Sequence, residues 1–213
     1  VVAVNGVRDR LKVLLVSGQP HAGERVWRNL LKSDPAVELV HFTILRTPEE
    51  NDFTPLRELA LISFPVTELF EVKLSEFDLI VFDRYTIRDI LSPTYFINIE
   101  NYLREGGAVM LAVGPGFAGD NSLFLTTLGA VMPGQPTGKV LEQGFRPGFT
   151  EKGKRHPVTA PLRNPSGKVE WGRWFRHVDA QAKRGTTLLN GVGEKPLLIL
   201  DRVGKGRVAQ LMS

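Results

Sequence analysis

The sequence predicts an α/β domain, in which a mainly parallel sheet lies between two layers of helices and ends in a C-terminal β-hairpin. Four short runs, at 11–16, 37–42, 77–83 and 108–113, have the apolar content or the alternation of buried strands. Apolar residues at helical spacing separate these runs, which favours a parallel sheet with helices on both faces. Near the C-terminus, two strand-like runs flank Gly204-Lys205-Gly206, as in a hairpin.

Local signals mark where two of the predicted helices begin and end. Asp34-Pro35 stops a helix over 23–33, because the residue before a proline disfavours helical dihedral angles. Ser92-Pro93 opens a later helix in the usual order of cap and proline, and Gly106-Gly107 ends it. The strand at 108–113 follows directly.

Two further helical segments are expected from weaker signals. Residues 55–76 hold two short helical patterns, and Thr67 is the expected N-cap of the second. After the strand at 108–113, we expect a helix over 122–131 that Asp120 or Asn121 caps. These segments complete the alternation of strands and helices.

The chain is expected to form one domain over residues 1–213. It divides into a core at 10–133, an excursion rich in Gly, Pro, Arg and Trp at 134–185, and closing strands at 186–213. A length of 213 residues is enough for a sizeable core. With 42% hydrophobic residues and a net charge of only +4, disorder is excluded as the dominant state.

Several classes of protein are excluded by what the sequence lacks. There is no cysteine, which removes disulfides, thiolate zinc sites and cysteine nucleophiles. No apolar run approaches the roughly 20 residues of a membrane span, and no signal peptide opens the chain. The chain begins at Val1 and ends inside an apolar pattern, so we expect a domain excised from a longer protein.

The charge is unevenly divided along the chain. Residues 1–138 carry 12 Lys/Arg and 17 Asp/Glu, whereas residues 139–213 carry 15 Lys/Arg and 6 Asp/Glu. A basic region can bind nucleic acid or an anionic membrane, or it can be one edge of a domain whose edges differ in charge. Because the basic residues are scattered among Gly, Pro and Trp, we favour the last reading and expect no nucleic-acid partner.

The loop after the strand at 108–113 is the first candidate site. Ligands of open α/β sheets bind beyond the carboxyl ends of the strands, where a catalytic nucleophile elbow would also lie. Gly114, Gly116 and Gly119 supply the small residues of such an elbow, but its tip, Pro115-Gly116-Phe117, has no nucleophile. A plain glycine-rich connection, a ligand-contacting loop and a catalytic elbow are the three readings.

Cofactor and metal motifs are not supported. Gly114-x-Gly116-x-x-Gly119 matches the dinucleotide fingerprint in spacing, but it follows the fourth strand, and the required later acidic residue is missing. No P-loop occurs, and the four histidines have no metal-binding spacing. We therefore predict no cofactor and no metal.

The histidines differ in their expected places. His21 lies in the first loop after a strand, which is typical of a ligand site, and His41 is expected on a face of the sheet. His156, in the run Lys154-Arg155-His156-Pro157-Val158, is either a turn-forming residue or a general base without an evident nucleophile partner.

Two further segments have alternative readings. Arg84, in Asp83-Arg84-Tyr85 at the end of a buried strand, can hold an anion or a carboxylate, or it can pair with Asp83 or Asp89. The run at 171–176 mixes Trp and Phe with Arg, so it can stack bases, pack a lid onto the sheet, or dock a partner domain.

The order of these segments resembles the class I glutamine amidotransferase-like superfamily, over roughly residues 10–213. The segments are Asp83-Arg84-Tyr85, Gly106-Gly107-Ala108-Val109-Met110-Leu111, Gly114-Pro115-Gly116-Phe117-Ala118-Gly119, Phe145-Arg146-Pro147 with Thr150, residues 153–159, and the runs from Pro196 to Leu198 and from Gly204 to Val208. The chain is most similar to domains described as glutamine amidotransferases in bacterial membrane proteins.

The resemblance implies a fold and a context, but it does not carry the activity over. It implies a flavodoxin-like three-layer sandwich in a longer, membrane-anchored protein, with this domain in the periplasm. Active members place a cysteine at the elbow, where this chain has Pro115-Gly116. The His-x-Glu of those members is not reproduced, since His156-Pro157-Val158 lacks the acid.

We therefore predict a non-catalytic module that binds a small molecule or an envelope protein. The alternative is a hydrolase with non-cysteine chemistry, in which His21 or His156 acts as a base on water. The predicted ligand-binding residues, with no catalytic residue among them, are His21, Arg84, Tyr85, Gly116, Phe117 and His156.

Overall fold

The computed structural model describes residues 10–43, 65–88, 90–164 and 171–213. It contains an eight-stranded sheet in the order β2-β1-β3-β4-β10-β9-β8-β6 and a separate two-stranded sheet, β5-β7. The strands are β1 (Leu11–Ser17), β2 (Val37–Thr43), β3 (Leu79–Asp83), β4 (Ala108–Ala112), β5 (Gly134–Leu141), β6 (Gly148–Phe149), β7 (His177–Ala182), β8 (Thr186–Asn190), β9 (Pro196–Val203) and β10 (Gly206–Leu211). The helices are α1 (Ala22–Ser33) and α3 (Pro93–Glu105), with short helical turns η1 (Glu68–Val72), η2 (Leu74–Glu76), η3 (Pro115–Ala118), η4 (Leu123–Leu125), η5 (Thr127–Ala130), η6 (Ala160–Leu162) and η7 (Val192–Glu194).

The sheet confirms the predicted fold class. Its first five strands, from β2 to β10, are parallel, and β9, β8 and β6 continue it antiparallel. The order 2-1-3-4 followed by a further parallel strand is that of the flavodoxin-like fold. The predicted C-terminal hairpin is present as β9 and β10.

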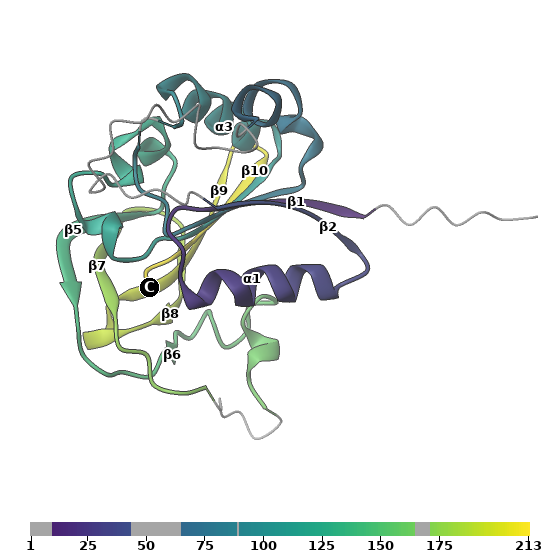
Figure 1. Ribbon diagram of the computed structural model, residues 1–213. Helices are drawn as coiled ribbons and strands as arrows, with labels where there is room; N and C mark the ends of the chain where they lie inside the picture. Colours follow the sequence, from purple (N-terminus) through teal and green to yellow (C-terminus); the bar gives the residue numbers. More distant parts are fainter. Residues whose placement is uncertain (1–9, 44–64, 89, 165–170) are drawn as a thin grey trace, which may run out of the picture.

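The alternation of side chains along the strands builds a core on each face of the sheet. Leu14 and Phe82 point into the larger core, to which α3 contributes Phe96 and Ile99. Val13, Leu15 and Val81 point to the other face, where Trp27 of α1 packs against them. Figure 1 shows α3 and α1 on opposite sides of the sheet, which explains why the central strands are apolar on both faces.

The predicted helix over 122–131 is wrong, because this segment forms the two short turns η4 and η5. Ser122 accepts a hydrogen bond from the backbone N–H of Phe124, and Thr126 accepts one from that of Leu128. Each hydroxyl thus caps its own short turn, and this local hydrogen bonding competes with a continuous helix. Asp120 and Asn121 are not the capping residues.

The helical patterns predicted within 55–76 are described only from residue 65 onward. There the chain forms the π-type turn η1 and the 3-10 turn η2 instead of a regular helix. Thr67 occupies the N-cap position of η1, but its side chain makes no capping hydrogen bond. The other pattern lies outside the described residues.

The excursion at 134–185 contributes a ribbon that covers the loop after β4. β5 and β7 pair antiparallel, and both pack against η3. The amide of Gln210 in β10 fixes the start of the ribbon, since Gln210 Oε1 accepts from Gly134 N at 2.8 Å and Gln210 Nε2 donates to Gly134 O at 3.1 Å. Figure 1 shows this ribbon beside the main sheet, on the side where β7 contacts β9.

Candidate ligand-binding site

The topology gives the expected ligand-binding position, called the crevice below, at the carboxyl ends of β1 and β3. In an open α/β sheet, ligands bind where the strand order reverses, and in the order 2-1-3-4 this point lies between β1 and β3. His21 follows β1 as the N-cap residue of α1, and Asp83 is the last residue of β3. Their side chains meet across this point, with Nε2 of His21 2.6 Å from Oδ2 of Asp83.

The hydrogen bonds of His21 fix which ring nitrogen donates and which accepts. Nδ1 accepts from the backbone N–H of Gly23 at 3.1 Å, so the ring proton is on Nε2 and is donated to Asp83. Both ring nitrogens are therefore engaged. Burial raises the pKa of the Asp83 carboxyl, and the hydrogen bond from His21 opposes that shift.

A second polar group lies next to this pair, beneath the first turn of α1. His41 Nε2 is 3.2 Å from Thr43 Oγ1, 3.4 Å from Ser17 Oγ and 3.5 Å from Glu24 Oε1. Thr43 also donates to Glu24 at 2.5 Å. Burial lowers the pKa of His41, although the Glu24 carboxylate opposes this shift. His41 thus lies on a sheet face, as the alternation of its strand predicts.

Ser17, His41 and Glu24 do not form a catalytic triad. A triad uses one ring nitrogen for the nucleophile and the other for the acid, whereas here both partners face Nε2 of His41. Ser17 is also fully buried, with 0% of its surface exposed, so a substrate has no access to its hydroxyl. The arrangement holds the first turn of α1 against β1 and β2.

Arg84 is held in a strained conformation between two glycines. Its φ of 49° is in the left-handed region, which costs a residue with a Cβ about 1–2 kcal/mol. A Cβ on Gly18 would lie 2.3 Å from the carbonyl oxygen of Arg84, and one on Gly114 would lie 2.6 Å from its Cγ. The loops after β1 and β4 therefore need glycine in order to accommodate Arg84.

The guanidinium of Arg84 acts electrostatically on Asp83, lowering the pKa of that carboxyl against the larger effect of burial. Within the described residues, its side chain has no hydrogen bond or ion pair, and only its backbone N–H is engaged, to Ala112 O. The ion pair with Asp83 that we considered as an alternative is not formed, and Asp89 lies outside the described residues.

Tyr85 and Phe117 do not line the crevice, contrary to our prediction. They are 2% and 1% exposed and belong to the larger core, where the Tyr85 ring packs edge-on against Phe82 and that of Phe117 against Phe124. The Tyr85 hydroxyl is buried without a hydrogen-bond partner in the described part of the chain. Gly116 is partly exposed in η3, and a Cβ there would lie 2.3 Å from Cγ2 of Thr86.

Among the described residues, no hydrogen bond or ion pair joins His156 to another predicted site residue. His156 follows a turn that Thr150 anchors on β8, where the Thr150 hydroxyl donates to Thr187 O at 2.8 Å. β8 is four strand positions from β3, or about 19 Å at the usual spacing of strands. His156 Nδ1 accepts from Val158 N at 3.2 Å, which agrees with the turn-forming reading.

The sequence pointed to His21 and Arg84, but it did not pair His21 with Asp83 or place Glu24 beside His41. His21 follows one buried strand and Asp83 ends another, but the sequence does not specify that these two strands are neighbours, which the order 2-1-3 shows. Among the residues that the structure describes, no three His, Asp or Glu side chains converge on a position that could hold a metal ion.

The strand order defines a flavodoxin-like fold, and solved structures of other proteins share it over most of this chain. Two cytoplasmic proteins of Salmonella typhimurium match 95% of this chain at TM-scores of 0.64 and 0.67, with 17% identity to each and 88% and 87% of their own chains covered. A ThuA-like protein of Parabacteroides merdae matches 95% of the chain at a TM-score of 0.55 and 15% identity, over 79% of its own length. ThuA-like proteins have the glutamine amidotransferase-like fold.

The same fold occurs inside a much longer enzyme. The β-galactosidase of Bacillus circulans sp. alkalophilus matches 95% of this chain at a TM-score of 0.55 and 12% identity, but the match covers 28% of that enzyme. At such identities the likeness concerns the fold alone. No family model and no curated protein matches the sequence. In the described residues, no helix has the length and apolar character needed to cross a membrane.

Proposed function

We propose that this chain is a non-catalytic glutamine amidotransferase-like module that binds a small anionic ligand in the crevice between β1 and β3. The observation that carries the proposal is the Arg84 guanidinium, which has no partner among the described residues and is held at the ligand-binding edge by a strained backbone. Backbone strain that the surrounding structure enforces is typical of functional positions. A guanidinium recognises carboxylates and phosphates with two parallel hydrogen bonds.

The residues around Arg84 fit binding better than catalysis. Both ring nitrogens of His21 are already hydrogen-bonded, so no nitrogen is free to take a proton from water. Of the two hydroxyls near His41, that of Ser17 is fully buried, and that of Thr43 donates to Glu24. Since the sequence has no cysteine, the family's own nucleophile is missing as well.

Isothermal titration calorimetry with phosphate, succinate and citrate tests the binding proposal. We expect saturable binding of at least one of these anions, and a loss of affinity of about tenfold or more in Arg84→Gln, because a charge-assisted pair contributes about 1.5–3 kcal/mol. Arg202→Gln is the matched control, since it removes the same charge at an exposed position in β9. Equal weakening in both variants would mean that only the net charge matters.

The second candidate is a hydrolase that uses His21, and the His21–Asp83 pair favours it, because a carboxylate-bound histidine is a common general base. It requires Nδ1 of His21 to exchange its bond with Gly23 N–H for one with water. Purified protein should then hydrolyse activated esters or amides at a rate that His21→Gln abolishes and His156→Gln does not. A rate that both variants retain removes this candidate.

Attachment to a membrane at the cell envelope, with this domain in the periplasm, is a separate part of the proposal and rests on the family resemblance. It would depend on segments outside the described residues. Two of the structural neighbours are described as cytoplasmic, so the compartment needs its own test. Fractionation of cells that express the full-length gene product should place it with the membranes, and recovery in the soluble fraction would overturn this part alone.

A further inference from the structure

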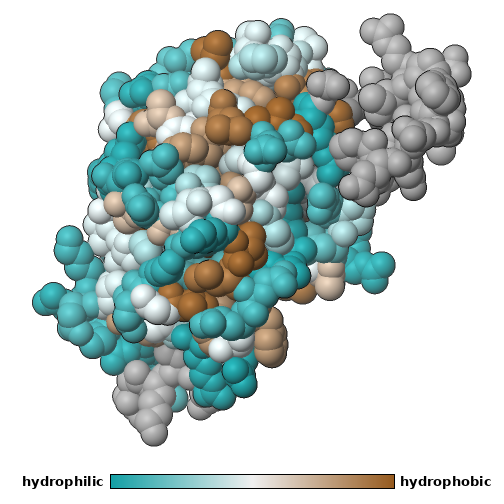
Figure 2. Space-filling model, turned by 90° about the vertical axis from the view of Figure 1, so that its left-hand side faces the viewer, coloured by the Kyte–Doolittle hydropathy of each residue, from teal (hydrophilic) through white to brown (hydrophobic). Residues whose placement is uncertain are grey.

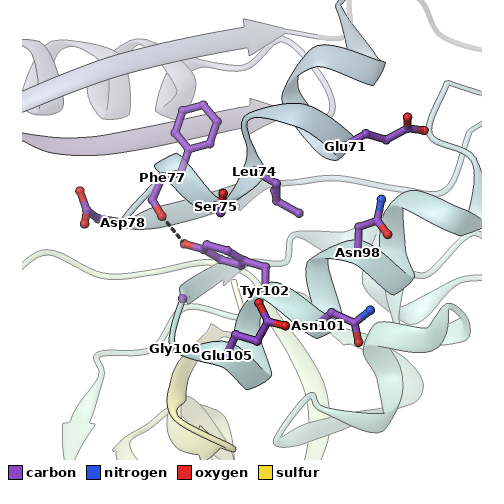
Figure 3. Close-up of a pocket in the computed structure, with 11 residues that line it drawn as sticks. Glu71, Leu74, Ser75, Phe77, Asp78, Asn98, Asn101, Tyr102, Glu105 and Gly106 are labelled. Carbon is purple, nitrogen blue, oxygen red and sulfur yellow. Dashed lines mark hydrogen bonds between the residues drawn. The ribbon is translucent and has the colours of Figure 1, made fainter.

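A cavity of about 580 Å³ lies at the edge of the sheet opposite the crevice. Its walls come from η1 and η2 on one side and the last two turns of α3 on the other, next to the starts of β3 and β4 (Figure 3). This volume is within the range of small-molecule sites, roughly 300–1,000 Å³. Nothing in the proposed function uses this cavity.

The floor of the cavity is fixed by Tyr102. Its hydroxyl donates to Phe77 O at 2.9 Å and accepts from Ala108 N at 3.2 Å, so the ring ties the end of η2 to the start of β4. Figure 3 shows this ring between the two walls, with the hydrogen bond to Phe77 drawn. The two walls are thereby held apart in one arrangement, which favours a preformed site.

The charged groups of the wall are all acidic. Glu71, Asp78 and Glu105 line the cavity, and none of the lining residues is Lys, Arg or His. Asp78 accepts a hydrogen bond from Lys12 N, whereas Glu71 and Glu105 have no ion pair within the described residues. The carboxyl end of α3 adds the negative end of its dipole. The chain as a whole carries +4, so this acidity is local.

The amides of the wall add hydrogen-bond acceptors. Asn98 donates to Phe70 O at 3.0 Å, which leaves its side-chain carbonyl oxygen able to accept. Asn101 has no hydrogen bond among the described residues, and Figure 3 shows both amides on the side where α3 borders the cavity. A ligand there needs positive charge and several N–H donors.

The spread of the carboxylates decides between a metal ion and an organic cation. No three acidic or histidine side chains of the described residues come close enough to hold one metal ion. Carboxylates that surround a ligand-sized space without converging on one point fit charges that are themselves separated. We propose that this cavity binds an organic polyamine, whose ammonium groups pair with Glu71, Asp78 and Glu105.

Titration calorimetry with spermidine at constant ionic strength tests this proposal. We expect saturable binding at one site per chain, weakened at least tenfold in the double variant Glu71→Gln/Glu105→Gln. The matched control is Asp120→Asn/Glu142→Gln, which removes the same charge from exposed positions outside the cavity and should bind as the wild type does. Both substitutions in each variant are at exposed side chains, so folding should be retained, and circular dichroism checks it.

Three outcomes would overturn the proposal. They are the absence of saturable spermidine binding at millimolar concentration, equal weakening in the cavity variant and the control, and displacement of spermidine by Mg²⁺ at equal charge concentration, which would indicate a site for a single ion. Selective loss in the cavity variant, with Mg²⁺ a weak competitor, would support it. Phosphate binding at the crevice should be unchanged in the cavity variant, so the two proposals can fail independently.

Discussion

The left-handed backbone of Arg84 gives the sharpest test of the candidate site. Arg84→Gly and Arg84→Ala remove the same guanidinium and nearly the same side chain, so their difference in stability reports on the backbone alone. In regular structure glycine is the less stable of the two. At a φ of 49°, we expect the reverse order.

The expected size follows from two opposing contributions. Alanine keeps the left-handed strain of about 1–2 kcal/mol, which glycine does not have. Glycine loses about 0.5–1 kcal/mol more chain entropy on folding. The free energy of unfolding of Arg84→Gly should therefore exceed that of Arg84→Ala by up to about 1.5 kcal/mol. For a chain of this length, each kcal/mol corresponds to roughly 2–4 °C in melting temperature.

Urea unfolding at neutral pH, followed by circular dichroism, measures this difference by linear extrapolation. Glu194, an exposed turn residue with a φ of 60°, provides the control, because its Gly and Ala variants should show the same order without any change in anion binding. If Arg84→Ala is more stable than Arg84→Gly while the Glu194 pair behaves as expected, Arg84 is not strained, and the argument for a built anion site loses its basis.

Four further substitutions test the site and the packing of the rest of the domain. Burial raises the pKa of Asp83, so the folded state binds that proton more tightly than the unfolded state, and this contribution to stability falls as the pH rises from the ordinary range of a carboxyl through the raised pKa of Asp83. In urea unfolding, the stability of Asp83→Asn relative to the wild type should therefore increase as the pH rises over this range. A relative stability that falls with pH would mean that an ion pair between Asp83 and His21 dominates. Tyr85→Phe removes an unpaired buried hydroxyl and should leave the free energy of unfolding unchanged or about 1 kcal/mol higher, whereas Tyr102→Phe should lower it by about 1–3 kcal/mol, and equal losses in both would contradict this reading. Gln210→Met leaves the backbone N–H and C=O of Gly134 without their hydrogen-bond partners. It should lower the free energy of unfolding by about 2–6 kcal/mol in the same assay. A loss below about 1 kcal/mol would show that water replaces the amide.

The fold could be predicted from the sequence because its signals are local. The runs at 11–16 and 77–83 are too apolar for an exposed face, and the proline and glycines around α3 fix its ends. The turns at 122–130 were missed because their break depends on the rotamers of Ser122 and Thr126, which the sequence does not specify.

The candidate site was predicted only in part, for a reason of geometry. Residues that follow a parallel strand reach the ligand-binding edge, as His21 and Arg84 do, but whether the next side chain points out or in depends on how the loop turns. After the left-handed Arg84, the chain directs Tyr85 into the core. The position of His156 depends on the strand against which its turn packs. That strand is β8, and no local sequence pattern predicts this contact.

The segment Asp83-Arg84-Tyr85 concentrates features that oppose folding. It contains a buried carboxyl with a raised pKa, a left-handed arginine, and a buried hydroxyl without a hydrogen bond. Each is of a kind that costs about 1–3 kcal/mol, and together they are a sizeable fraction of the 5–15 kcal/mol by which a folded domain is usually stable. Conflicts with folding tend to gather where a protein binds or reacts. If replacing each of the three residues leaves the domain as stable or more stable, stability does not explain their presence, which would leave ligand binding at the crevice beside Asp83 and Arg84 as the explanation.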